Sequence, residues 1–164
     1  MKTNSNVTKA IQLFFSIFII SHTTFAQDST KTTASVQDWV NEKNFVFTPQ
    51  TAMPMKGRAI HLTSYFDCRV SKDTLISNLP YYGRSYSASI NPSENGLSFV
   101  TTSFDYSVKT RKKGGWQVTI KPQKANDVRE MDFTIFDNGS ATLYVSSNNR
   151  EAISFNGIVS QNKK

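Results

Sequence analysis

Residues 97–121 read LSFVTTSFDYSVKTRKKGGWQVTIK, and they decide the fold class. Apolar and polar side chains alternate over residues 97–109 and again over residues 116–121, which is the period of a half-buried strand. Between these runs, Gly114 and Gly115 tolerate the positive φ that tight hairpins require. The stretch therefore predicts two antiparallel strands joined by a short turn.

The same period of two recurs outward from this hairpin along most of the chain. Further strands are predicted over residues 45–48, 60–66, 84–90, 128–136, 141–146 and 152–159. Glycine and asparagine pairs separate most of them, so about eight strands follow one another as antiparallel neighbours. The predicted fold class is mostly β, with an antiparallel meander that closes into a lipocalin-like barrel or folds into a two-layer sheet. The apolar positions change from odd to even numbers between Phe99 and Phe104, and a β-bulge is the simplest explanation.

A short N-terminal helix is predicted before the sheet. Val36 and Val40 recur at helical spacing, and Ser35 is in position to cap a helix that ends near Asn44. Residues 53–57 follow the first strand and are predicted to form a loop because of their proline and glycine content.

The first 26 residues have the pattern of an export signal. Two lysines precede an apolar run over residues 10–20, which is shorter than the roughly 20 residues that a bilayer core requires. Residues 24–26 supply the small side chains of a cleavage site, so we expect cleavage after Ala26. The mature protein is then soluble, not membrane-spanning, and exported to the periplasm or the extracellular space. Residues 27–35 are expected to be a flexible leader and residues 36–164 a single β-rich domain.

Cleavage of this signal changes the net charge and the number of histidines, and both limit the possible functions. The whole chain has 164 residues, with 19 Lys plus Arg against 12 Asp plus Glu. Removal of Lys2 and Lys9 and of no acid lowers the formal net charge from +7 to +5. His61 and Cys68 are then the single histidine and the single cysteine, which are too few for an ordinary zinc site or an internal disulfide. We expect no cofactor and no metal, and we expect Cys68 to be a buried thiol.

Several short motifs resemble one known family. They are Met53–Met55 with Gly57, Leu79–Arg84, Asn138–Ala141 and Asn149–Gly157. On these motifs the chain resembles the domain-of-unknown-function family 4251, small exported proteins found mainly in Bacteroidetes. The resemblance runs from about Val36 to about Val159 and implies an exported, β-rich, lipocalin-like domain in a Gram-negative envelope. It implies no reaction and no ligand, so it assigns no catalytic residue.

The chain is poor in the groups that catalysis needs. His61 is the one imidazole left to activate a nucleophile, and on a single regular strand it would lie on the opposite face from Cys68. Paired carboxylates are the remaining route, because a glycosidase needs only two across a cleft. Asp105 and Asp132 are the candidates, but each alternates with aromatic or apolar neighbours and is expected to be solvated on the outer face. The acids over residues 127–132 form a cluster in or near a turn and are expected to be solvated too.

A basic run at the predicted hairpin tip is typical of nucleic-acid-binding proteins. Lys109, Arg111, Lys112 and Lys113 come just before the two glycines. Exposed lysines at such a tip also aid solubility and discourage edge pairing, and nucleic acid is not an expected partner of an exported protein. Anionic glycans or lipid head groups suit that compartment better.

Aromatic side chains are the best candidates for a binding site. Residues 80–83 place two adjacent phenols in a loop, and aromatic side chains of the predicted strands are in position to line one face. The candidate ligand-binding residues are Tyr81, Tyr82, Arg84, Tyr86, Phe104, Tyr106 and Trp116. For the two loop tyrosines the favoured alternative is structural, because a closed sheet needs its ends covered: Tyr81 or Tyr82 plugs the end of the barrel, and Gly83 permits the turn.

These observations favour a non-enzymatic, exported binding protein of the cell envelope, whose ligand is an apolar small molecule, a lipid or a glycan. The first alternative is a structural or protein-interaction module of the periplasm, and the second is a carboxylate-dependent hydrolase. A hollow interior would favour a carrier, and a filled interior would favour a scaffold.

Overall fold

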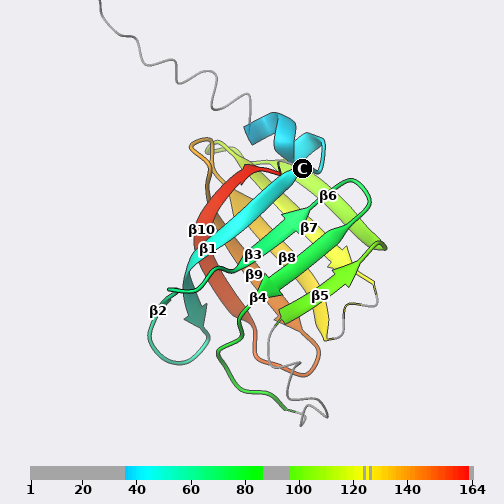
Figure 1. Cartoon of the computed structure of the whole chain (residues 1–164). Helices are drawn as coiled ribbons and strands as arrows, with labels where there is room; N and C mark the ends of the chain where they lie inside the picture. Colours follow the sequence, from blue (N-terminus) through cyan, green and yellow to red (C-terminus); the bar gives the residue numbers. More distant parts are fainter. Residues whose placement is uncertain (1–35, 87–96, 124, 126, 163–164) are drawn as a thin grey trace, which may run out of the picture.

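The computed structural model describes residues 36–86, 97–123, 125 and 127–162, which form a short helix and ten strands (Figure 1). The helix covers residues 36–41, close to the prediction. The strands are β1 (Phe45–Pro54), β2 (Ile60–His61), β3 (Asp67–Val70), β4 (Leu75–Leu79), β5 (Leu97–Thr101), β6 (Phe104–Thr110), β7 (Trp116–Pro122), β8 (Val128–Ile135), β9 (Ser140–Ser147) and β10 (Ile153–Gln161). None of the described residues belongs to a helix with the length and hydropathy that a bilayer crossing requires.

The strands form one antiparallel sheet that is nearly closed into a barrel. Their order is β5-β4-β3-β1-β10-β9-β8-β7-β6, and β2 pairs with β1 off this path. All of these pairs are antiparallel. The predicted fold class, mostly β with an antiparallel sheet and a short N-terminal helix, is therefore confirmed.

A single kinked segment brings the two edges of the sheet together. Strands β5 and β6 are separated by only two residues, yet β5 pairs with β4 at one edge and β6 pairs with β7 at the other. The kink is held by hydrogen bonds to the end of β7. Thr101 Oγ1 donates to the carbonyl of Gln123 at 2.8 Å, and Gln123 N donates to the carbonyl of Ser103 at 2.8 Å. The predicted β-bulge is thus wrong: the apolar phase changes because the chain leaves one strand partner and joins another.

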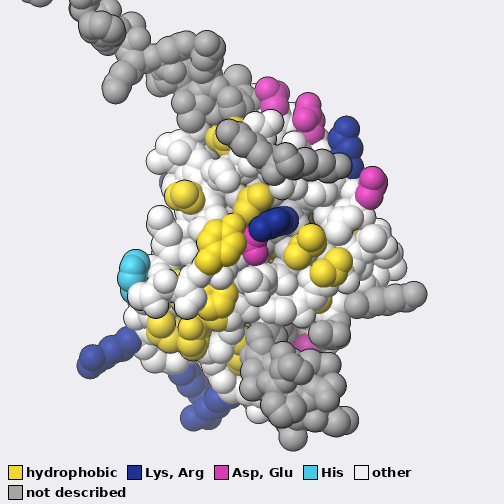
Figure 2. Space-filling model, viewed as in Figure 1, with side chains coloured by type: hydrophobic (Ala, Val, Ile, Leu, Met, Phe, Trp, Pro, Cys, Tyr) yellow, Lys and Arg dark blue, Asp and Glu magenta, His cyan; other side chains and the backbone are white. Residues whose placement is uncertain are grey.

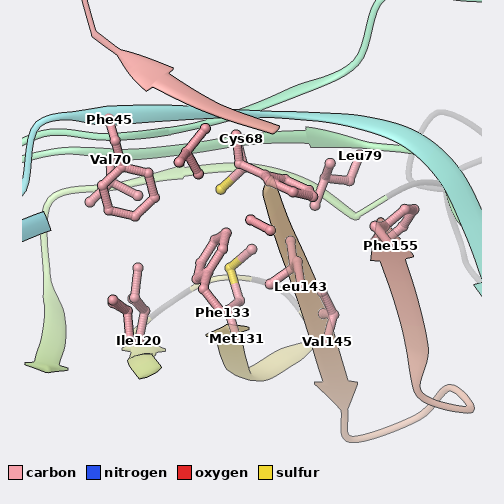
Figure 3. Close-up of a cluster of buried hydrophobic side chains, with 14 of the residues drawn as sticks. Phe45, Cys68, Val70, Leu79, Ile120, Met131, Phe133, Leu143, Val145 and Phe155 are labelled. Atoms are coloured by element: carbon pink, nitrogen blue, oxygen red, sulfur yellow. The ribbon is translucent and has the colours of Figure 1, made fainter. Parts of the chain in front are cut away.

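The interior of the barrel is filled by large apolar side chains (Figure 3). The rings of Phe45 and Phe47 on β1 meet the ring of Phe133 on β8 edge to face, with centroid distances of 5.6 and 5.7 Å. The large side chains with less than 2% exposure are Phe45, Phe47, Phe133, Phe155, Leu75, Leu79, Ile120, Met131, Ile135, Leu143, Ile153 and Val36. Because such cores pack as densely as organic crystals, these positions form a solid centre.

One strand predicted in the first half of the chain is largely wrong, and two strands there were not predicted. The strand predicted over residues 60–66 is reduced to β2, and the chain turns before β3 begins. Strands β3 and β4 were not predicted, since Asp67 and Ser77 are polar but buried. Ser77 is satisfied there because its Oγ donates to the carbonyl of Leu97 at 2.6 Å. A buried polar group with a partner is stable, but its presence hides the strand pattern.

Two further boundaries differ from the prediction. Strand β1 continues through the predicted start of the loop at residues 53–57, because a register shift after Pro49 accommodates the proline opposite β10. Residues 84–86, predicted to begin a strand, form no regular strand, and Ser85 makes only an isolated bridge with Arg150. The remainder of that predicted strand, the signal and the leader lie outside the described residues.

Candidate functional site

Three of the predicted binding residues lie on the inner face of β6 and β7. Trp116 is only 7% exposed, and Phe104 and Tyr106 are half-buried against the core. The hydroxyl of Tyr106 donates to the carbonyl of Val40 at 2.6 Å, and Lys43 Nζ lies 5.2 Å from the centre of its ring. Burial raises the pKa of the Tyr106 phenol. These contacts attach the N-terminal helix to the barrel.

Tyr81 links two loops at the opposite end of the barrel. Its hydroxyl lies 2.7 Å from the carbonyl of Arg84 and 3.0 Å from that of Glu151, in donor geometry to both. The guanidinium of Arg150 lies over its ring at 5.2 Å. The pKa of Tyr81 is raised, chiefly by burial and then by the charge of Glu151. A Cβ at Gly83 would stand 2.6 Å from the Tyr81 hydroxyl, so the glycine leaves room for this ring. These contacts agree with the structural role stated as the alternative.

The other loop candidates do not join the residues of β6 and β7. Tyr82 is half-buried and packs against the core, whereas Arg84 and Tyr86 are exposed. The backbone N–H of Tyr86 donates to the carbonyl of Asn149 at 2.8 Å, and that of Glu151 donates to the carbonyl of Arg84 at 3.0 Å. The seven predicted residues are therefore divided between two ends of the barrel.

An ion pair beside Tyr81 corrects the prediction that the acids over residues 127–132 are simply solvated. Asp127 and Arg150 have side chains 15% and 11% exposed, with Arg150 Nε 3.4 Å from Asp127 Oδ2. Asp127 Oδ1 also accepts from the backbone N–H of Asn149 at 2.8 Å. Glu130 pairs with Lys121 at 3.3 Å. The alternation of apolar and polar residues could not reveal the pair of Asp127 with Arg150, because these two residues lie in two different loops.

The remaining catalytic candidates lie on four different strands. Cys68 is fully buried, and burial followed by the charge of Asp67 raises its pKa, whereas His61 is exposed on β2. Asp105 is exposed on β6, and Asp132 on β8 accepts a hydrogen bond from Thr119 at 2.6 Å. Both carboxylates point outward, as predicted. In the part of the chain that the structure describes, no three His, Cys, Asp or Glu side chains are grouped as metal ligands.

An open groove of about 570 Å³ runs along β1 and the connection from β2 to β3. Its lining residues are Thr48, Pro49, Gln50, Thr51, His61, Leu62, Thr63, Ser64, Tyr65 and Phe66. We call it the Tyr65 groove. The N–H of Leu62 donates to the carbonyl of Gln50 at 2.9 Å and holds the two sides together. Tyr65, 66% exposed, presents an aromatic ring at the groove.

A buried carboxylate follows this tyrosine at the start of β3. Asp67 points to the outer face of β3, and its carboxylate accepts a hydrogen bond from Arg69 Nε. The pKa of Arg69 is raised by this hydrogen bond and by the charge of Asp67, and in addition by a hydrogen bond with Tyr65. Figure 2 shows hydrophobic side chains gathered around one basic and one acidic group on this face. Asp67 thus holds Arg69, which lies close to Tyr65.

Sequence reasoning missed this groove because it placed Tyr65 on a regular strand. The available signal was a large aromatic residue at a position predicted to face solvent. Single exposed apolar residues are common, so the signal was weak until the groove was seen beside it.

Comparisons with known proteins identify the fold and no activity. The family described as Domain of unknown function (DUF4251) matches residues 27–159. The chain is similar to the crystal structure of a DUF4251 family protein from Bacteroides eggerthii, with 13% identity and a TM-score of 0.58, over 80% of this chain and 88% of that one. None of the curated proteins matches the sequence. At this identity the structural likeness concerns the fold alone.

Proposed function

The chain belongs to the DUF4251 family, and on this premise we propose that it is a non-enzymatic binding domain of the cell envelope that takes a neutral, hydroxyl-rich ligand, a glycan, in the Tyr65 groove. One observation carries the proposal: the barrel centre is filled, while an exposed ring stands beside an open groove. A ligand inside the barrel would have to displace fully buried rings, which costs packing energy. A ligand in the groove displaces only water.

The chemistry of the lining favours a neutral ligand. No carboxylate, lysine or arginine is among the ten lining residues. Hydroxyl and amide groups such as those of Thr48, Gln50 and Ser64 donate and accept hydrogen bonds, which suits the hydroxyl groups of a sugar. The face of the Tyr65 ring suits the apolar face of a sugar ring. A charged ligand would find no opposite charge in this lining, so specificity for neutral glycans follows.

The ion pair of Arg69 with Asp67 is also consistent with a neutral ligand. Because the guanidinium charge is compensated by the buried carboxylate, the arginine near Tyr65 attracts anions only weakly. The same lining contains no carboxylate pair, and His61 is its only imidazole, which supports a binding role over hydrolysis.

The test is binding of the purified protein to an array of neutral gluco-, manno- and xylo-oligosaccharides. We expect Tyr65→Ala to lower the affinity for the glycans that bind by about 10-fold, because loss of one aromatic contact costs about 1 kcal/mol or slightly more. Tyr65→Phe keeps the ring and should retain most of the affinity. Titration calorimetry with the best oligosaccharide measures the difference.

Tyr144→Ala is the matched control, since Tyr144 is also an exposed tyrosine but lies on β9, away from the groove. It should leave the affinity within about twofold. Absence of binding to every neutral glycan would contradict the proposal and favour the structural or protein-interaction alternative. Equal losses for Tyr65→Ala and Tyr144→Ala would also contradict it.

The envelope location rests on the sequence pattern of residues 1–26. We expect protein recovered from an envelope fraction to begin at Gln27, which intact-mass measurement or N-terminal sequencing would establish. A chain that retains Met1 and stays in the cytoplasmic fraction would contradict export.

A further inference from the structure

Two turns lie against each other at the helix end of the barrel (Figure 1). One joins β6 to β7, and the other joins β8 to β9. A Cβ at Gly115 would stand 2.2 Å from the carbonyl oxygen of Ile135 and 3.0 Å from Phe136 Cα, so only glycine permits this approach. Gly114 and Gly115 also have φ of 85° and 78°, which form the turn. The contact fixes the position of Phe136 beside the first turn.

The first turn is strongly basic. It contains Arg111, Lys112 and Lys113, Lys109 lies just before it at the end of β6, and the three lysines are exposed. We call residues 109–113 the basic turn. Asp137, in the neighbouring turn, is the one acidic residue of the two turns. The nearby helix region contributes Asp38, Glu42 and Lys43, which together are not positive, so the positive charge belongs to this hairpin and not to the whole end of the barrel.

A cation–π contact between Arg111 and Phe136 connects the two turns. The guanidinium of Arg111 lies over the ring of Phe136, 5.0 Å from its centre. Its Nη1 is buried and has no hydrogen-bond partner among the described residues. This nitrogen is closed to solvent, so the charges that can face an anionic surface are those of the three exposed lysines. Phe136 stays 38% exposed beside these cations.

We propose that the basic turn, together with Phe136, docks the domain onto an anionic lipid surface. Cations next to an exposed ring match the headgroup layer of a membrane, where lysines meet phosphates and an aromatic side chain enters the boundary. A free phosphate would use the cations but gain nothing from the ring. This site lies at the opposite end of β1 and β10 from the β1–β2 loop, and it does not depend on a ligand in the Tyr65 groove.

Sedimentation with lipid vesicles tests the proposal on the purified protein. We expect binding to vesicles that contain phosphatidylglycerol, no binding to phosphatidylcholine alone, and release as salt is raised. The double variant Lys112→Glu/Lys113→Glu should bind at least about 25-fold more weakly, because each lysine near such a surface contributes about 5-fold. Phe136→Ala should weaken binding about 3-fold without changing the salt dependence.

The matched control makes the same change of charge elsewhere. Lys56→Glu/Arg58→Glu lies in the exposed β1–β2 loop at the other end of the barrel and should change vesicle binding by less than about 3-fold. A loss as large as that of the Lys112/Lys113 variant would overturn the proposal, because net charge alone would then explain binding. Tighter binding to a single-stranded oligonucleotide than to vesicles, or displacement from vesicles by millimolar inorganic phosphate, would also overturn it. None of these outcomes affects glycan binding by Tyr65.

Discussion

Replacement of Gly157 by alanine is expected to lower the free energy of unfolding by about 3 kcal/mol. Gly157 lies on β10, opposite Pro49 of β1 and next to the register shift in that pair. A Cβ at this position would stand 2.1 Å from the carbonyl oxygen of Thr48 and 2.8 Å from Pro49 Cα. Both atoms belong to the backbone, so neither can rotate away. The added methyl group must push β1 and β10 apart at the centre of the sheet.

Urea denaturation followed by far-ultraviolet circular dichroism measures this loss. Ser160→Thr is the matched control, because it also adds one methyl group on β10 but at an exposed position. It should change the free energy of unfolding by less than about 0.5 kcal/mol. A Gly157→Ala variant as stable as the parent would mean that the two strands do not approach as closely as described.

The sequence predicted the second half of the barrel better than the first, for a physical reason. Most inward positions of strands β7 to β10 carry apolar side chains, such as Val118, Phe133 and Phe155, so the period of two is easy to recognise. In β3 and β4 the inner positions include Cys68 and Ser77, and Asp67 is buried on the outer side. The polarity of a residue does not show whether the folded protein buries it. Ser77 is buried because it has a hydrogen-bond partner on another strand, which the residue type alone does not reveal.

The closure of the barrel shows the same limit. The change of phase between Phe99 and Phe104 was visible in the sequence, but its cause was a change of strand partner. The period of the apolar residues describes one strand at a time and does not show which strands pair. The hydrogen bond of Thr101 with Gln123, 22 residues apart, is therefore found only in the structure.

The candidate site was the least predictable part. Tyr81 was identified as notable, with a structural role as a plug of the barrel end as the alternative, but its partner Arg150 lies 69 positions further along the chain. The Tyr65 groove is assembled from β1 and the β2–β3 connection, neither of which has an unusual composition. Chemical motifs were absent there, so only the three-dimensional arrangement distinguishes the groove.

Phe133→Ala is expected to lower the free energy of unfolding by about 3 to 5 kcal/mol. The ring is fully buried and meets the rings of Phe45 and Phe47 edge to face. Its removal loses both contacts and leaves a cavity that the surrounding strands cannot close completely. Phe136→Ala is the control for loss of a phenyl ring at a partly exposed site, and it should cost less than about 1 kcal/mol.

The same variant tests whether the barrel carries apolar ligands. An apolar cavity of about 150 Å³ stays dry and binds benzene, so Phe133→Ala should gain a rise in melting temperature with benzene that the parent lacks. The parent lacks this rise in melting temperature only if its interior is already full, because a full interior has no room for benzene. A parent protein whose melting temperature rises with benzene or with a fatty acid would show that its interior opens, and a carrier role would then replace the surface groove as the better proposal. If only the variant responds, the filled core is scaffold, and recognition by this domain belongs to its outer surface.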